Sequence, residues 1–290
     1  MQRTTDLAMT ALAPIVWGST YLVTTEALPD GYPLTVAALR ALPAGLLLLA
    51  ITRSLPPRAF LSRLFILGAL NFAIFWALLF VAAYRLPGGA AATLGALQAL
   101  MVIGFARFFL GTPIQGISVL AAIFGVFGVA ILLSGSDAGY DPLGILAALG
   151  GTLSMAAGTV LSRKWQPDVP VLTYTAWQLT AGGMLLLPGA LIAEPQLPPL
   201  TASNVFGLVW LGLIGAAASY WFWLRGIVRL GPGNVAMLGM LSPVTAVILG
   251  WLWLGESLTT VQLVGAGVVL GSIWVGQVAS RPSRVAQEIP

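Results

Sequence analysis

The chain is a succession of long apolar runs separated by short segments that contain proline, glycine or charged residues. A helix needs about 20 apolar residues to cross roughly 30 Å of hydrocarbon, and most of the runs reach that length. The runs cover residues 7–26, 34–52, 61–84, 88–109, 114–133, 142–162, 171–193, 204–227, 232–253 and 259–279. We therefore predict an all-α integral membrane protein with ten transmembrane helices and no soluble domain.

The composition agrees with a lipid-facing surface and excludes several classes of function. Only 8% of the 290 residues are charged and 58% are hydrophobic, whereas the surface of a soluble protein is about a quarter to a third charged. The net charge of +4 comes from scattered basic residues, which argues against a nucleic-acid partner. The chain contains neither cysteine nor histidine, so it lacks the usual metal ligands and a histidine for catalysis. We expect no enzymatic activity, no metal and no cofactor.

Two segments of the chain repeat each other. Residues 87–112 align with residues 231–256 at an offset of 144, which pairs Arg85 with Arg229. A second alignment, at an offset of 137, pairs Pro33 with Pro170 near the start of two other runs. Two copies of one unit account for both alignments.

A repeat of five helices crosses the membrane an odd number of times, so the second copy must enter from the opposite side. Such inverted repeats are related by a pseudo-two-fold axis in the membrane plane and are typical of carriers. We predict two inverted five-helix repeats, residues 1–135 and 136–290, joined through the connection at 134–141.

The distribution of basic residues predicts the orientation. With the N-terminus in the cytoplasm, every basic residue except Arg85 and Arg40 lies at or near the cytoplasmic side. Arg85 lies outside and Arg40 lies within the second helix. Both termini are therefore expected in the cytoplasm.

Three motifs resemble a known family. WGSTYLV at 17–23, PLTVAALR at 33–40 and LSPVTAVILGWLWLGE at 241–256 resemble the EamA-like, ten-helix branch of the drug/metabolite transporter superfamily, and the resemblance extends over nearly the whole chain. The first copy departs from the third motif, since Ala99 replaces its proline and Thr112 its acid.

The resemblance implies a carrier in a bacterial inner membrane, with a central pathway lined by helices 1, 3, 4, 6, 8 and 9. The similarity is greatest to bacterial amino-acid exporters, which implies efflux of amino acids, aromatic ones included. Gly267 and Gly271 form a G-x-x-x-G pair on the last helix, which suits close packing within or between chains. The pair does not by itself predict a dimer, and we expect a monomer.

Equivalent polar faces predict where a substrate could bind. Gln98 and Met101 share one face of the fourth helix, and their repeat partners Ser242 and Thr245 share the matching face of the ninth. A polar pair at one depth in both copies is what a site at the bilayer midplane needs. Alternatively, these side chains bond only to neighbouring helices. Pro243 removes one backbone donor, which either exposes a carbonyl near Ser242 or produces a packed kink.

Aromatic residues mark the other predicted lining helices. Trp17 and Tyr21 lie four residues apart on the first helix, and a tryptophan at mid-depth needs a partner for its N–H group. Trp76 aligns with Tyr220, and Ser154 with Trp17. Packing in the interior or against lipid is the alternative for each. The predicted substrate-binding residues are Trp17, Tyr21, Asn71, Trp76, Gln98, Met101, Ser154, Tyr220, Ser242 and Thr245.

The positions of the charged residues predict whether transport is coupled to protons. The helix centres contain no Asp or Glu, whereas proton-coupled carriers use carboxylates within the membrane. We therefore favour facilitated transport, with Glu256 as the nearest candidate carboxylate or simply a structural helix-end residue. Arg40 is expected to snorkel toward water, to pair with Glu26 or Asp30, or to attract carboxylates at the outer mouth.

Other functions remain open on these residues. A proton-coupled drug or metabolite exporter is one alternative. A sugar-phosphate exchanger is another, although it needs several basic residues facing its cavity. A membrane sensor or scaffold is the alternative outside transport.

Overall fold

The computed structural model describes residues 2–29, 31–86, 94–132, 134, 141–253, 255 and 259–279, without the side chains of Tyr21, Ala83 and Tyr84. Every regular element in these residues is a helix. The predicted boundary near residue 135, Asp30 and Glu256 lie outside the described residues.

The helices of the first half follow the predicted apolar runs. They are α1 (Gln2–Ala27), α2 (Pro33–Thr52), the 3-10 helix η1 (Arg58–Phe60), α3 (Leu61–Gly68), the π-helix η2 (Ala69–Ala73), α4 (Ile74–Arg85), α6 (Gln98–Leu110) and α7 (Gly116–Leu132). The elements from η1 to α4 form one continuous rod, which corresponds to the predicted helix 61–84.

The helices of the second half also follow the predicted apolar runs. Its helices are α8 (Pro142–Lys164), α9 (Val171–Ala193), α10 (Ala202–Val209), the π-helix η3 (Trp210–Ala218), α11 (Ser219–Leu230), α12 (Pro232–Leu238), α13 (Leu241–Trp253) and α14 (Thr260–Ala279). The predicted bounds agree with these helices to within a few residues.

The surface of the bundle is apolar, as a lipid-facing surface must be. Large hydrophobic side chains such as Phe108, Ile192 and Trp274 are largely exposed. Seven helices of the described residues are long and apolar enough to cross a membrane, and Leu94–Leu110 and Gly116–Leu132 are shorter apolar helices. The chain is thus an integral membrane protein, whereas the number of ten crossings stays a prediction.

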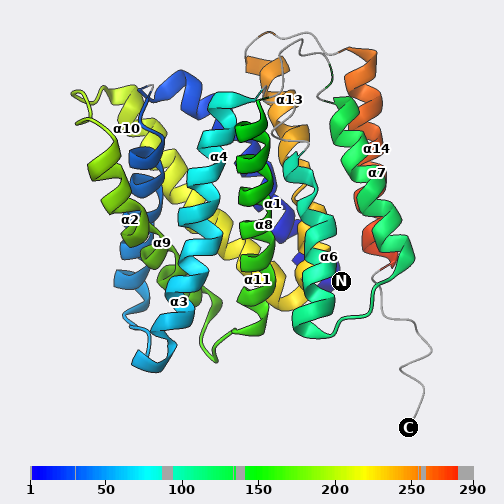
Figure 1. Cartoon of the computed structure of the whole chain (residues 1–290), viewed down its shortest axis with the longest axis horizontal. Coiled ribbons are helices and arrows are strands. Elements are labelled where there is room, and N and C mark those ends of the chain that lie inside the picture. Colours follow the sequence, from blue (N-terminus) through cyan, green and yellow to red (C-terminus); the bar gives the residue numbers. More distant parts are fainter. Residues whose placement is uncertain are drawn as a thin grey trace.

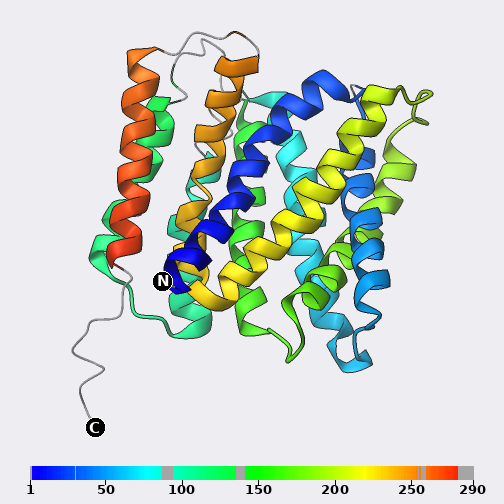
Figure 2. The same ribbon diagram turned by 180° about the vertical axis from the view of Figure 1, so that it is seen from behind.

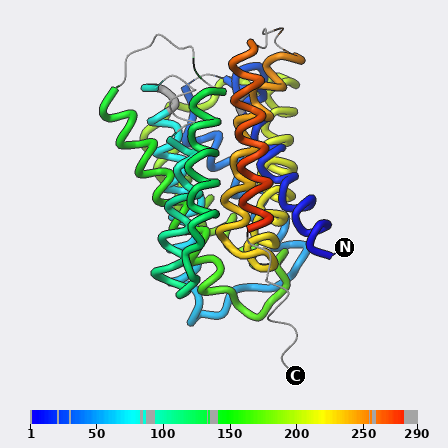
Figure 3. Tube along the Cα trace, turned by 90° about the vertical axis from the view of Figure 1, so that its right-hand side faces the viewer, coloured from blue at the N-terminus to red at the C-terminus, as the bar shows by residue number. Residues whose placement is uncertain are grey.

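The helices run roughly alongside one another (Figure 3). The pair α2 and α9 packs on one flank and the pair α7 and α14 on the other, with α1, α8, α11 and α13 between them (Figure 1). The helix α1 rises from the end of the bundle where the N-terminus lies, whereas α8 descends toward that end (Figure 1). From behind, α1 lies beside both α11 and α13 (Figure 2).

The two π-helices occupy corresponding positions. Adding the offset of 144 to residues 69–73 of η2 gives residues 213–217, which lie within η3. A π-helix shifts the hydrogen-bond ladder by one residue and often marks a functional site. The irregular backbone therefore recurs at positions that the offset of 144 relates.

The helices α6 and α13 also begin at irregular turns, whose positions differ by one residue at the offset of 144. The N–H of Leu97 bonds to Leu94 O at 3.2 Å, and the N–H of Ser242 bonds to Gly239 O at 3.1 Å. Pro243 explains the second turn, because it has no N–H to offer the carbonyl four residues before it. Of the two alternatives for Pro243, an exposed carbonyl is the less well supported, because the N–H of Ser242 bonds to the carbonyl oxygen of Gly239.

At the end of the bundle that carries the N-terminus, α12 packs against α6, and Met237 and Leu238 share a hydrophobic cluster with Val102 and Ala106. We call this end the tight end. In the described residues, α13 makes no comparable contact with α6.

Candidate functional site

Five aromatic side chains meet among the inner helices: Trp17 of α1, Phe72 of η2, Trp76 of α4, and Tyr220 and Trp223 of α11. We call them the aromatic cluster. The ring centre of Trp17 lies 4.9 Å from those of Tyr220 and Trp223, and Phe72 lies 4.6 Å from Tyr220 and 5.3 Å from Trp76. Trp17 is partly buried and the other four are buried. The structure thus brings together three of the predicted site residues.

Sequence reasoning missed Phe72 and Trp223. Trp223 follows Tyr220 by three residues, so both lie on one face of α11, and that spacing was the available signal. Its ring also lies beside the turn before α13, because a Cβ added to Gly239 would meet it at 3.5 Å. The aromatic cluster therefore contacts the turn between α12 and α13, which together correspond to the predicted helix 232–253.

Trp17 has the polar partner that its depth in the membrane requires. Its Nε1–H donates to the carbonyl oxygen of Gly215, in η3, at 3.1 Å. A π-helix can leave such a carbonyl free for a side chain, because its ladder is displaced. The partner is backbone rather than cavity water or a polar side chain.

Arg40 lies at the edge of the same cluster, and the alternative in which it snorkels toward water was wrong. Only 8% of Arg40 is exposed. Its Nη2 donates to the carbonyl oxygen of Gly215 at 2.8 Å, and its guanidinium lies 4.8 Å from the ring centre of Trp76. No carboxylate of the described residues lies within ion-pair distance of it. A buried cation thus faces aromatic rings and one carbonyl.

The predicted residues of α13 lie against α1. A Cβ added to Gly18 would lie 2.6 Å from Thr245 Cβ and 2.7 Å from Ser242 O. Glycine permits this approach because it has no side chain. The hydroxyl of Thr245 donates to Leu241 O at 3.0 Å within its own helix. Ser242 and Thr245 therefore lie against Gly18, the residue that follows Trp17.

The predicted residues of α6 are partly buried and stand apart from the cluster in the described contacts. Met101 packs against the hydrophobic cluster around Val102. The Nε2 atom of Gln98 is buried without a hydrogen-bond partner. A buried amide lacking a partner is costly, so a ligand that accepts a hydrogen bond there would be favoured.

Asn71 and Ser154 take part in bonds between helices. Asn71 Nδ2 donates to Gln178 Oε1 at 2.8 Å and to Ser162 Oγ at 3.1 Å, which uses both of its amide hydrogens. Ser154 Oγ donates to Leu70 O at 2.8 Å. These contacts match the alternative of helix packing. The side chain of Tyr21 lies outside what the structure describes.

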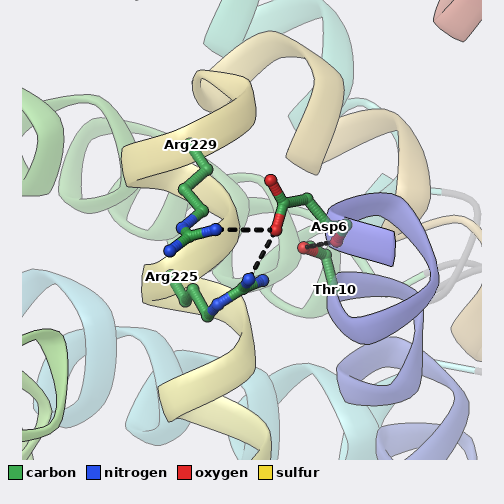
Figure 4. Close-up of polar contacts among 4 residues, drawn as sticks. All are labelled: Asp6, Thr10, Arg225 and Arg229. Carbon is green, nitrogen blue, oxygen red and sulfur yellow. Dashed lines mark hydrogen bonds and ion pairs between the residues drawn. The ribbon is translucent and has the colours of Figure 1, made fainter. Parts of the chain in front are cut away.

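An ion cluster joins α1 to α11 at the tight end of the bundle (Figure 4). The buried carboxylate of Asp6 accepts from Arg225 and, at 3.2 Å, from Arg229. Thr10 Oγ1 donates to the carbonyl oxygen of Asp6 at 2.7 Å, and a Cβ added to Gly226 would lie 2.4 Å from Thr10. We call Asp6, Arg225 and Arg229 the ion cluster. The ion cluster links α1 to α11.

The outer surface is apolar, and the inner helices are interrupted at positions related by the offset of 144. Together with the buried cation among aromatic rings, these features indicate a polytopic membrane protein with the architecture of a transporter. The chain belongs to the EamA-like transporter family, whose model matches residues 5–134 and 142–275. This confirms the resemblance to the drug/metabolite transporter superfamily. Membership points to movement of small metabolites rather than to catalysis.

Several relatives are similar over most of their length. Protein PecM of Dickeya dadantii (strain 3937) is 41% identical over 94% of this chain and 92% of that protein. The uncharacterized inner membrane transporter YedA of Escherichia coli (strain K12) is 29% identical over 89% and 86%. A probable amino-acid metabolite efflux pump of the same strain is 24% identical over 93% and 94%.

A solved crystal structure has the same fold. It aligns with a TM-score of 0.81, covers 96% of this chain and 98% of its own, and is 22% identical. At this identity the likeness shows the fold alone.

Proposed function

We propose that the protein is a bacterial inner-membrane carrier that exports amino acids, including those with aromatic or apolar side chains. The observation that carries the proposal is the aromatic cluster, which places aromatic rings beside a buried cation among the inner helices. The name of the Escherichia coli relative, a probable amino-acid metabolite efflux pump, favours the same substrate class. The carrier acts as a monomer with both termini in the cytoplasm.

Transport proceeds by alternating access between two inverted repeats, residues 1–135 and 136–290. The matching positions of η2 and η3 support the repeat, and the opposite courses of α1 and α8 support the inversion. The ion cluster and the packing of α12 on α6 hold the N-terminal end closed. At the opposite end the described residues record no comparable packing of α13 on α6, and we expect this end to open to the solute.

The transport is facilitated rather than driven by protons. Asp6 is the one buried carboxylate of the described residues, and two arginines hold it. Proton-coupled carriers use carboxylates within the membrane, and none of the other described carboxylates is buried. Uptake into vesicles therefore needs no imposed pH gradient, and strict dependence on a gradient would contradict this assignment.

Counterflow in reconstituted liposomes tests the proposal. Vesicles that contain the purified protein and are preloaded with unlabelled amino acid should accumulate labelled threonine, phenylalanine and tryptophan above the level of empty vesicles. Phenylalanine and tryptophan should move faster, because the aromatic cluster receives their side chains. If none of the three moves while a drug or a sugar phosphate does, the substrate assignment is wrong.

A further inference from the structure

We propose that Arg40 binds the carboxylate of the transported amino acid, with the substrate side chain placed against the aromatic cluster. The inference rests on the proposed function and names the group that recognises one end of the substrate. It starts from a cation that lies within the membrane-spanning part of the protein and has no anionic partner among the described residues.

The contacts of Arg40 leave it incompletely satisfied. Its Nη2 bonds to Gly215 O, whereas its Nε is buried without an acceptor. A guanidinium presents five N–H donors in a planar fork and suits a carboxylate, which can accept two parallel hydrogen bonds. An anion that reached this edge would satisfy donors that the protein leaves open.

A purely structural role explains these contacts less well. The carbonyl oxygen of Gly215 already accepts from Trp17 at 3.1 Å, so it does not need Arg40 to be satisfied. An apolar side chain at position 40 would avoid the cost of burying a charge between membrane helices. The charge is therefore better explained by a ligand than by the need to cap one carbonyl.

The residues around Arg40 restrain the orientation of its guanidinium and favour a carboxylate over a phosphate as its ligand. The contact with Trp76 and the bond to Gly215 restrain its plane. The shared carbonyl places the guanidinium beside Trp17, so that a carboxylate on Arg40 would direct its substituent toward aromatic rings. One buried arginine balances the single charge of a carboxylate, whereas a phosphate dianion calls for more cations.

The wild-type protein provides the first test. Quenching of tryptophan fluorescence in detergent should report phenylalanine binding, and phenylalaninamide and phenethylamine, which lack the carboxylate, should bind at least about tenfold more weakly. Equal affinity for the three compounds would overturn the role of Arg40. If the protein neither binds nor moves any amino acid, the proposed function itself fails.

Substitutions provide the second test. Arg40→Gln should weaken phenylalanine binding by about tenfold or more and leave the weak binding of phenylalaninamide unchanged, whereas Arg40→Lys should recover part of the loss. Arg58→Gln, at an exposed arginine of η1, is the matched control and should bind as the wild type does. An equal loss for both compounds would assign Arg40 to structure, and no loss for either would also overturn the inference. Should Arg40→Gln fail to fold, the wild-type comparison decides.

Discussion

Trp17 of α1 and Arg40 of α2 donate hydrogen bonds to the same acceptor, the carbonyl oxygen of Gly215, at 3.1 and 2.8 Å. The acceptor belongs to η3, where the π-helical ladder differs from that of an α-helix. Through this one oxygen, the irregular backbone of the second half fixes two side chains of the first half. The aromatic cluster thus depends on contacts between the two halves.

Removing the indole donor should loosen this junction. Trp17→Phe keeps an aromatic ring but leaves Gly215 O with Arg40 as its remaining side-chain donor, so the free energy of unfolding should fall by about 1 kcal/mol. Thermal unfolding in detergent measures the change. The control is Trp253→Phe, because Trp253 is 69% exposed on the apolar surface. An equal effect of both substitutions would show that the bond to Gly215 contributes nothing.

A methyl group at Gly18 should disturb the contact between α1 and α13. The added carbon would lie 2.6 Å from Thr245 Cβ, and such overpacking costs about 1–3 kcal/mol. Gly18→Ala should therefore unfold at a lower temperature and slow phenylalanine counterflow. Gly267→Ala is the control, because nothing lies within 4 Å of its added carbon. Wild-type behaviour of Gly18→Ala would mean that the helices approach less closely than described.

Neutralising Asp6 should open the tight end of the bundle. Asp6→Asn leaves two arginines without their carboxylate, and removing one partner of a buried ion pair costs about 3 kcal/mol. The chain has no cysteine, so a single cysteine at the buried position Met237 reports on opening through its reaction with maleimide. The reaction should be faster with Asp6→Asn than with wild-type Asp6.

The control for that experiment is Asp141→Asn, which breaks the exposed pair with Arg85 at the start of α8. It should leave the labelling at position 237 unchanged. Equal acceleration by both substitutions would mean that the ion cluster does not close the end where it lies.

Asp141 should give a weak acid dependence of stability. The hydrogen bond from Arg85, and after it the N–H of Leu143, lowers the pKa of Asp141 from its ordinary value of 3.8. Because the pKa is lower in the folded protein, the contribution is complete above the unfolded pKa and is lost as the pH falls through the folded pKa. Asp141→Asn should therefore be less stable than wild type near about pH 6, and the difference should shrink below about pH 4. Thermal unfolding across this range measures it.

The apolar runs predicted the helices well because membrane crossing imposes a strict length and polarity on each of them. The prediction of α9 as 171–193 matches its observed bounds. The offset of 144 also paired Trp76 with Tyr220, which the structure places 6.1 Å apart between ring centres. Patterns of this kind are local or repeated, and the sequence displays them directly.

Other parts of the site follow from contacts that no local pattern records. For Arg40 the sequence left water, Glu26 or Asp30 as alternative partners, whereas the structure shows a bond to a backbone oxygen of a π-helix 175 residues away. Asp6 meets Arg225 across 219 residues of chain. Asn71 was predicted to bind substrate, yet both of its amide hydrogens serve Gln178 and Ser162. Such pairings depend on how the helices pack in three dimensions, so they are seen only in the structure.

The substitution Ser242→Cys, which introduces a single cysteine, tests most directly whether the solute passes between the two halves. Position 242 lies partly exposed beside Gly18 and close to the aromatic cluster. In vesicles of known orientation, a membrane-impermeant thiol reagent should reach the introduced thiol from the side opposite the N-terminus, and phenylalanine should slow the reaction. If the reagent reacts from neither side, or if phenylalanine has no effect on its rate, the pathway does not run through this site.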